Sequence, residues 1–127
     1  MTSSNVQPLW INERYYGSVK SAKDKYKIYE TFVTNGDEKF VVEVDNCVGS
    51  TEIVVAKSFS DLMENKFEYK NSKSQYGKIF APLQVPKEGT VKYVIGVRSN
   101  NIKANIDQDY SDYYIETRNF ETDDEVG

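Results

Sequence analysis

Hydrophobic and polar residues alternate along most of this chain in short runs, and a period of two residues predicts β-strands with one buried face. The clearest run lies within residues 88–101, where Val91, Tyr93 and Ile95 occupy every second position after a Glu-Gly turn. Earlier runs with the same period lie at residues 25–33, 39–47 and 51–58.

The connections between the runs contain residues that favour turns. Asn35-Gly36 is among the strongest signals for a β-hairpin, because both residue types accept a positive φ angle. We therefore expect the three runs in the first half of the chain to pair as an antiparallel meander. Pro82 and Pro86 confine a later run to the edge of a sheet or to a bulge.

Residues 58–77 show no clear period. Ser60 is of a type that caps helices, but Leu62, Met63 and Phe67 are irregularly spaced. The segment is either one helical turn or a long connection that crosses between two sheets.

Short strands at spacings of about ten residues, with little helix between them, predict an all-β fold. The expected architecture is an antiparallel β-sandwich of jelly-roll-like form with seven or so strands. Residues 1–127 form a single domain with a core over about residues 8–120, and the acidic tail at 121–127 is expected to fray. The expected core consists of Trp10, Ile28, Phe32, Phe40, Val42, Val44, Ile53, Val55, Val91, Tyr93, Ile95, Val97 and Ile115.

Composition and charge exclude several classes of function. The chain has 127 residues, a net charge of −4 and no basic stripe, which excludes binding of duplex nucleic acid. No apolar run approaches the roughly 20 residues that span a bilayer, and the N-terminus lacks a secretory signal pattern. Cys47 is the single cysteine, which excludes an internal disulfide; we expect it to be a half-buried structural residue at the end of a strand.

Catalysis has little support in the sequence. There is no histidine, which removes the Ser-His and Cys-His dyads, and there is no Gly-rich phosphate loop or nucleophile elbow. The glutamates at 30, 43, 52 and 116 alternate with apolar residues, as outward positions of strands do. We expect no enzyme, but a non-catalytic binding or accessory module of a larger extracellular or lumenal protein. A cytosolic adaptor remains the alternative, because a lone thiol and the absence of N-glycosylation sites also fit the cytoplasm.

Two irregular segments, at residues 59–76 and 100–112, carry aromatic residues beside charges, a mixture typical of protein-contact surfaces. Loops at the end of a sandwich vary without disturbing the core, so we expect a protein partner to bind there. The alternative is a carbohydrate held by surface tyrosines, because the adjacent Tyr113 and Tyr114 must point to opposite faces of their strand. The expected ligand-binding residues are Phe67, Tyr69, Tyr76, Tyr110 and Tyr114.

The acidic loop before the last strand could bind a metal ion. Asp107, Asp109 and Asp112 are closely spaced, and calcium takes six to eight oxygen ligands. Their spacing does not match an EF-hand, and a solvated loop whose aspartates keep a sheet edge soluble is the interpretation that we favour. The sequence requires no cofactor and allows calcium.

With the strands assigned, the chain resembles pre-peptidase C-terminal (PPC-type) domains from about residue 10 to 118. "EGTVKYVIGVRS" and "SDYYIETR" are similar to the end of these domains, where a strand of the kind G-x-Y-x-I-x-V, a polar loop and a Y-x-I strand close the sheet. "YYGSVKSAKDKYKIYETFVTNGDEKFVVEV" is similar to their beginning. The positions that match are Gly17, Asp24, Tyr26, Ile28, Gly36, Val42, Gly89, Tyr93, Ile95, Val97, Tyr113 or Tyr114, and Ile115.

The chain departs from this family in two places. Bacterial members carry an Asp-Ala-Asp-Leu segment in the fourth strand, where this chain has "GSTEIVVAK", and the insertion at residues 58–76 is longer than the family pattern. These departures argue against transferring a calcium-binding or collagen-binding role from bacterial members to this chain. In some protozoa similar domains form the lumenal part of receptors for cysteine proteases or glycosidases. The resemblance thus implies a further alternative, a cargo-binding segment of a receptor that sorts hydrolases to lysosomes.

Overall fold

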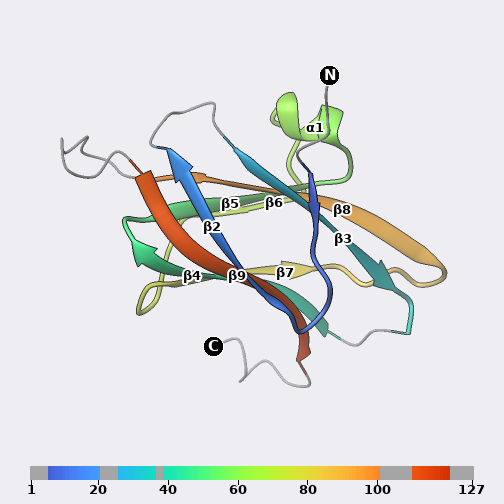
Figure 1. The fold of residues 1–127 in the computed structure, drawn as a ribbon. Coiled ribbons are helices and arrows are strands. Elements are labelled where there is room, and N and C mark those ends of the chain that lie inside the picture. The colour runs from blue at the N-terminus through green and yellow to red at the C-terminus, as the bar shows by residue number, and fades with distance from the viewer. Residues whose placement is uncertain (1–5, 21–25, 37–38, 101–109, 121–127) are drawn as a thin grey trace.

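The computed structural model describes residues 6–20, 26–36, 39–100 and 110–120. Within these residues, nine strands form two sheets that pack face to face, and one short helix lies outside them (Figure 1). The elements are β1 (Gln7–Pro8), β2 (Arg14–Lys20), β3 (Lys27–Thr34), β4 (Lys39–Val48), β5 (Thr51–Ala56), α1 (Phe59–Met63), β6 (Tyr69–Asn71), β7 (Lys78–Leu83), β8 (Thr90–Ser99) and β9 (Tyr110–Phe120).

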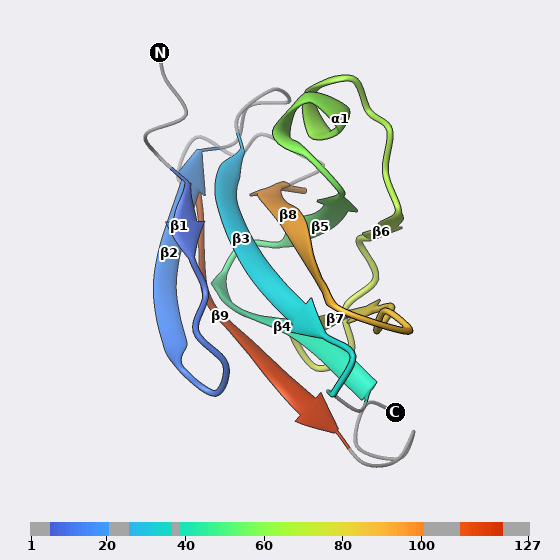
Figure 2. The same ribbon diagram turned by 90° about the vertical axis from the view of Figure 1, so that its right-hand side faces the viewer.

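The two sheets have five and four strands. The order is β1-β3-β8-β5-β6 in one and β2-β9-β4-β7 in the other, and every pair is antiparallel except β1 with β3. The antiparallel β-sandwich predicted from the sequence is therefore confirmed. The expected meander is wrong, because β3 and β5 flank β8 in one sheet while β4 lies in the other (Figure 2). Strands that each have one apolar face can oppose one another across a core as well as pair side by side.

The inner faces of the sheets form the main core. Tyr29 of β3 and Tyr113 of β9 meet across it, with their hydroxyl oxygens 2.7 Å apart, so that each buried hydroxyl has a partner. A Cβ atom on Gly17 of β2 would lie 2.5 Å from the Tyr113 ring, so only glycine fits there. The core consists of Leu9, Val19, Tyr29, Val33, Phe40, Val42, Val44, Ile53, Val55, Ile79, Ala81, Leu83, Tyr93, Ile95, Val97, Tyr113 and Ile115.

Three residues of the expected core lie elsewhere. Trp10 is 67% exposed and Phe32 is 56% exposed, while Ile28 packs on the outside of the five-stranded sheet. The predicted phase of β3 was off by one residue, because Tyr29 and Val33 face the core and Phe32 faces outward. A shift of one residue moves every side chain of a strand to the opposite face. The other expected core residues are buried, apart from Val91, which is partly buried against the core.

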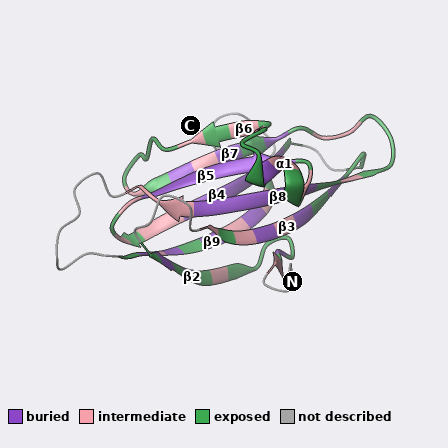
Figure 3. Ribbon diagram, turned by 90° about the horizontal axis from the view of Figure 1, so that it is seen from above, coloured by how far each residue is buried: buried purple, intermediate pink, exposed green. Residues whose placement is uncertain are grey.

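Helix α1 covers the outer face of the five-stranded sheet. Leu62 of the helix is fully buried against Val54, Ala56 and Val94, which point away from the main core. β5 is therefore buried on both faces along its whole length (Figure 3). Ser58 is the N-cap of the helix, in place of the expected Ser60, and its side chain accepts a hydrogen bond from the backbone of Asp61.

Candidate functional site

The turn between β6 and β7 is closed by two backbone hydrogen bonds. Gln75 N donates to Lys78 O over 2.8 Å, and Lys78 N donates to Gln75 O over 3.0 Å. The two residues between them, Tyr76 and Gly77, have φ angles of 55° and 83°. Positive φ at both central positions defines a type I′ turn. The turn is also held to β4, because Asn46 N donates to Gly77 O over 2.8 Å.

Tyr76 is an unusual residue for this position. A positive φ brings Cβ close to the following carbonyl and favours Gly, Asn or Asp, so a tyrosine here is a conformational outlier. Its exposed fraction is 103%, so the ring contributes no packing to the fold. Strained residues of this kind are concentrated at functional sites. Tyr76 is therefore the strongest candidate for a contact residue among those predicted from the sequence.

The segment around Tyr76 is basic in an acidic molecule. Between Glu68 and Glu88 the chain contains four lysines and no Asp or Glu, although the net charge is −4. Of these lysines, Lys70 lies on β6 and Lys78 on β7, on the two sides of the turn. Lys73 forms no ion pair with any residue that the structure describes, and its side chain is exposed.

Lys70 and Lys78 each approach a buried glutamate. In the Glu52 cluster, Glu52 accepts a hydrogen bond from Arg98, and Lys70 Nζ lies 3.9 Å from its carboxylate. In the Glu43 cluster, Glu43 is held by Arg118 at 2.9 Å and by Lys78 at 3.8 Å. The relative exposure of the glutamate side chains is 9% and 7%. Both glutamates point outward, as expected, but they are more buried than ordinary outward positions.

The other four predicted contact residues are less exposed than Tyr76. Phe67 is half-buried against the cluster around Leu62, and Tyr69 is half-buried against the main core. Tyr110 and Tyr114 are 39% and 37% exposed on β9. Their roles in binding stay predictions, and Tyr76 alone projects freely.

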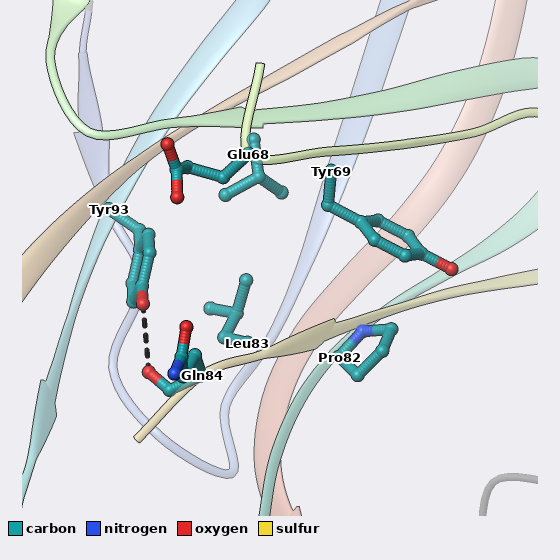
Figure 4. Close-up of a pocket in the computed structure, with 7 residues that line it drawn as sticks. Glu68, Tyr69, Pro82, Leu83, Gln84 and Tyr93 are labelled. Atoms are coloured by element: carbon teal, nitrogen blue, oxygen red, sulfur yellow. Dashed lines mark hydrogen bonds between the residues drawn. The ribbon is translucent and has the colours of Figure 1, made fainter. Parts of the chain in front are cut away.

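Tyr69 lines a small hollow at the edge between the sheets (Figure 4). The Tyr93 hydroxyl donates to Gln84 O over 2.8 Å there, and burial raises the pKa of Tyr93. The hollow has a volume of about 90 Å³, well below the roughly 300 Å³ of the smallest ordinary ligand pockets. It is lined by Val55, Glu68, Tyr69, Pro82, Leu83, Gln84 and Tyr93.

A second hollow, of about 220 Å³, lies beside the turn between β1 and β2. Exposed Trp10, Ile11 and Phe32 form its rim over a floor of buried Leu9 and Phe40. Sequence reasoning missed this site because it placed Trp10 and Phe32 in the core. The signal was present in β3, since Glu30 shares the phase of Phe32 and a charged residue marks the outward face.

The outer face of the four-stranded sheet carries a ladder of tyrosines and ion pairs. We call it the open face and define it by Arg14, Tyr16, Asp45, Tyr114 and Glu116. Arg14 donates to Asp45 over 2.9 Å and to Glu116 over 3.0 Å, and it lies 4.7 Å from the Tyr114 ring centroid. The hydrogen bond to Asp45 is the main cause that raises the pKa of Arg14.

The predicted calcium ligands are described only in part. Asp107 and Asp109 lie outside the described residues, while Asp112 lies on β9. A side-chain hydrogen bond joins Asp112 to Tyr16 and raises the pKa of that tyrosine. One carboxylate oxygen of Asp112 is buried and has no hydrogen-bond partner among the residues that the structure describes. No group of three potential metal ligands occurs within the described part of the chain, and calcium binding stays a prediction.

Cys47 is exposed, and not half-buried as expected. The register between β4 and β9 shifts between Asn46 and Val48, so a bulge leaves Cys47 outside the pairing.

Neither of the two hollows contains a pair of carboxylates among its lining residues. In the described residues, no helix is long and apolar enough to cross a membrane.

No protein-family model and no curated protein sequence matches the chain. Among solved structures, it is similar to the pre-peptidase C-terminal domain of a collagenase from Bacillus anthracis, with a TM-score of 0.62 and 15% identity over 92% of this chain and 98% of that one. It is also similar to PliG of Aeromonas hydrophila, a periplasmic inhibitor of g-type lysozyme, with a TM-score of 0.52 and 13% identity over 89% of this chain and 94% of that one. At these identities the likeness concerns the fold alone, and this chain has a β-sandwich fold like that of pre-peptidase C-terminal domains.

Proposed function

We propose that this domain is a non-catalytic binding module that contacts a protein partner at the end of the sandwich where the β6–β7 turn lies. The observation that carries the proposal is Tyr76, a wholly exposed ring on a strained and hydrogen-bonded turn. Exposed tyrosines on rigid supports are typical binding hot spots, because they bury a large area at little cost in conformational entropy. One structural neighbour is an inhibitor of a lysozyme, so a similar sandwich is compatible with protein binding.

Affinity capture tests this proposal. The wild-type domain and the Tyr76→Ala variant are immobilised and incubated with lysate of the source organism, and captured proteins are quantified by mass spectrometry. A partner should be retained by the wild type and lost with Tyr76→Ala. Tyr16→Ala on the open face is the matched control, because Tyr16 is also a largely exposed tyrosine. Equal capture by wild type and Tyr76→Ala would refute the proposal.

Carbohydrate binding is the second candidate function. The hollow beside Trp10 is a better candidate for the sugar site than the tyrosines of the open face. Trp10 and Phe32 present two exposed rings, and Thr34 adds a polar side chain to the rim. A glycan array would test this function. Trp10→Ala should abolish any glycan signal, whereas signal loss only with Tyr114→Ala would place the sugar on the open face.

For location, we propose an extracellular or lumenal compartment, where the domain belongs to a larger protein. A cargo-binding segment of a hydrolase-sorting receptor is one such setting. An antibody against the domain would test it by immunofluorescence, with lysosomal and plasma-membrane markers. Uniform cytoplasmic staining would favour the adaptor alternative.

A further inference from the structure

We propose that the partner surface is an apolar pocket rimmed by carboxylates, into which Tyr76 inserts while the neighbouring lysines pair with the acidic rim. This inference rests on the proposed function and specifies the chemistry of the partner at that same site. It follows from the shape of the turn, the distribution of charge around it and its rigidity.

The shape of the turn calls for a concave partner. Tyr76 is one of the two central residues of a two-residue turn, and no atom of the described chain covers its ring. A projecting ring on a flat surface would leave most of its area in water. A tyrosine buries its full area of about 150–250 Å² only when a pocket surrounds it. The pocket is therefore apolar along its walls.

The charge around the turn calls for an acidic rim. Between Glu68 and Glu88 every charged residue is a lysine, and Lys78 lies two residues after Tyr76. Lys78 lies 3.8 Å from Glu43, but Arg118 also pairs with that carboxylate at 2.9 Å, so Glu43 alone does not neutralise both cations. Lys73 adds a further positive charge within the β6–β7 connection. A positive patch on an otherwise acidic molecule steers association toward a negative surface.

The turn is organised before binding. Two hydrogen bonds between Gln75 and Lys78 close the turn, and the bond from Asn46 to Gly77 fixes its backbone to β4. A side chain presented by a fixed turn loses little further entropy on binding. Within the fold, no packing contact of the Tyr76 ring compensates for the strain of its positive φ angle. A contact with a partner would provide that compensation.

A photocrosslinking experiment reads the partner's chemistry directly. In the domain, Tyr76→p-benzoylphenylalanine keeps an aromatic ring at the tip; the variant is incubated with lysate of the source organism and irradiated. The cross-linked partner peptide is then identified by mass spectrometry. We expect it to contain apolar residues, with Asp or Glu nearby on the partner's surface. The partner so identified is then produced and used as the probe in titrations.

The titrations compare four single variants. Tyr76→Asn should weaken binding by at least about 30-fold, as expected for loss of a hot-spot ring. Lys73→Glu and Lys78→Glu should weaken it about tenfold each at 50 mM salt and less at 500 mM salt. Lys57→Glu is the matched charge control, because Lys57 is exposed and precedes α1. It should bind as the wild type does.

The outcomes separate the two proposals. If Tyr76→Asn binds normally, or if its melting temperature falls, the ring has a structural role and both proposals fail. If Tyr76→Asn loses binding but Lys73→Glu and Lys78→Glu bind normally, the acidic rim is wrong while the proposed function stands. Cross-links to a site without carboxylates would likewise overturn the acidic rim alone. Cross-links to nucleic acid or to glycan alone would overturn the protein partner altogether.

Discussion

The outer faces of the two sheets are completed in different ways. On the five-stranded sheet, α1 covers the face, and Leu62 forms a second apolar core with Val54, Ala56 and Val94. On the four-stranded sheet, the open face has no helix among the described elements and is lined by Arg14, its two carboxylate partners and two tyrosines. One face is thus stabilised by burial and the other by exposed cross-strand pairs.

The two faces nevertheless share one structural feature, a cluster of ion pairs around a glutamate. Each carries a nearly buried glutamate held by one arginine and one lysine, in the Glu52 cluster and the Glu43 cluster. Arg98 additionally donates to the Tyr26 hydroxyl over 3.0 Å and lies 5.3 Å from that ring. The comparison teaches that the apolar cover, and not the ion pairs, distinguishes the faces. Substitutions on each face can test this conclusion.

The largest effect is expected from Leu62→Ala on the covered face. Leu62 is fully buried, so truncation leaves a cavity between α1 and the sheet and should lower the free energy of unfolding by about 3 kcal/mol. Chemical denaturation measures the change. Met63→Ala is the control within the same helix, because Met63 is 46% exposed, and its effect should stay within about 0.5 kcal/mol. Equal effects of the two variants would mean that the helix is not a stabilising cover.

The sequence predicted the sandwich and allowed a helical turn within residues 58–77, but it did not predict that this turn covers a sheet. The alternation of apolar residues was sufficient for the fold class and for most of the inner core. The run Ile53–Ala56 is apolar at four consecutive positions, which is a signal for a strand buried on both faces. The element that covers it has only five residues, too few for a helical period to be recognised.

The candidate site was predictable only in part. Tyr76 could be named because it is an aromatic residue beside charges in an irregular segment. Its full exposure and positive φ could not be read from the sequence, because tyrosine is a strand-forming type and is unfavourable at that position of a turn. Phe67 and Tyr69 looked equivalent to it, but tertiary packing half-buries both.

The second largest effect is expected at the ion-pair clusters around Glu52 and Glu43, which the two faces share. Glu52→Gln and Glu43→Gln should each lower the free energy of unfolding by about 2 kcal/mol, because each removes a nearly buried carboxylate charge that pairs with an arginine. The measurement is again chemical denaturation. Glu64→Gln provides the control, since that glutamate pairs with Lys66 at an exposed position. If only one of Glu52→Gln and Glu43→Gln were destabilised, the ion pairs would also distinguish the faces.

The inner core that both faces share should respond to alkaline pH. Burial is the largest cause that raises the pKa of Tyr29 and of Tyr113 above the usual value of 10. Their folded-state pKa values are raised, so the associated stability is complete below pH 10. Above pH 10 the unfolded chain loses these protons first, and stability should fall by about 1.4 kcal/mol per pH unit for each tyrosine.

Denaturation curves between pH 8 and pH 11.5 measure this slope. Tyr113→Phe should reduce the slope above pH 10 by about one tyrosine's share, while also lowering stability at pH 8 through loss of the bond to Tyr29. An unchanged slope in Tyr113→Phe would show that ionisation of Tyr113 does not drive the alkaline loss.

A smaller effect of opposite sign is expected at the turn that connects β6 on one sheet with β7 on the other. Tyr76→Asn should raise the free energy of unfolding by about 1 kcal/mol, because asparagine accepts the positive φ that strains tyrosine. Tyr76→Ala keeps a Cβ and removes only the ring, so it should change stability by less than about 0.5 kcal/mol. A marked destabilisation by Tyr76→Ala would mean that the ring packs on the fold after all.

The smallest effect is expected from Arg14→Ala on the open face. The Arg14 side chain is 44% exposed, so solvent screens its pairs with Asp45 and Glu116, and the loss should be about 0.5–1 kcal/mol. Raising the salt concentration to 0.5 M should reduce this loss further, because exposed ion pairs are screened. Arg14→Lys should recover only part of it, since an ammonium group cannot bridge two carboxylates with the planar geometry of a guanidinium. If Arg14→Ala instead lowered the free energy of unfolding by about 3 kcal/mol regardless of salt, the open face would stabilise the fold as much as the face that α1 covers. The contrast between the two faces would then disappear.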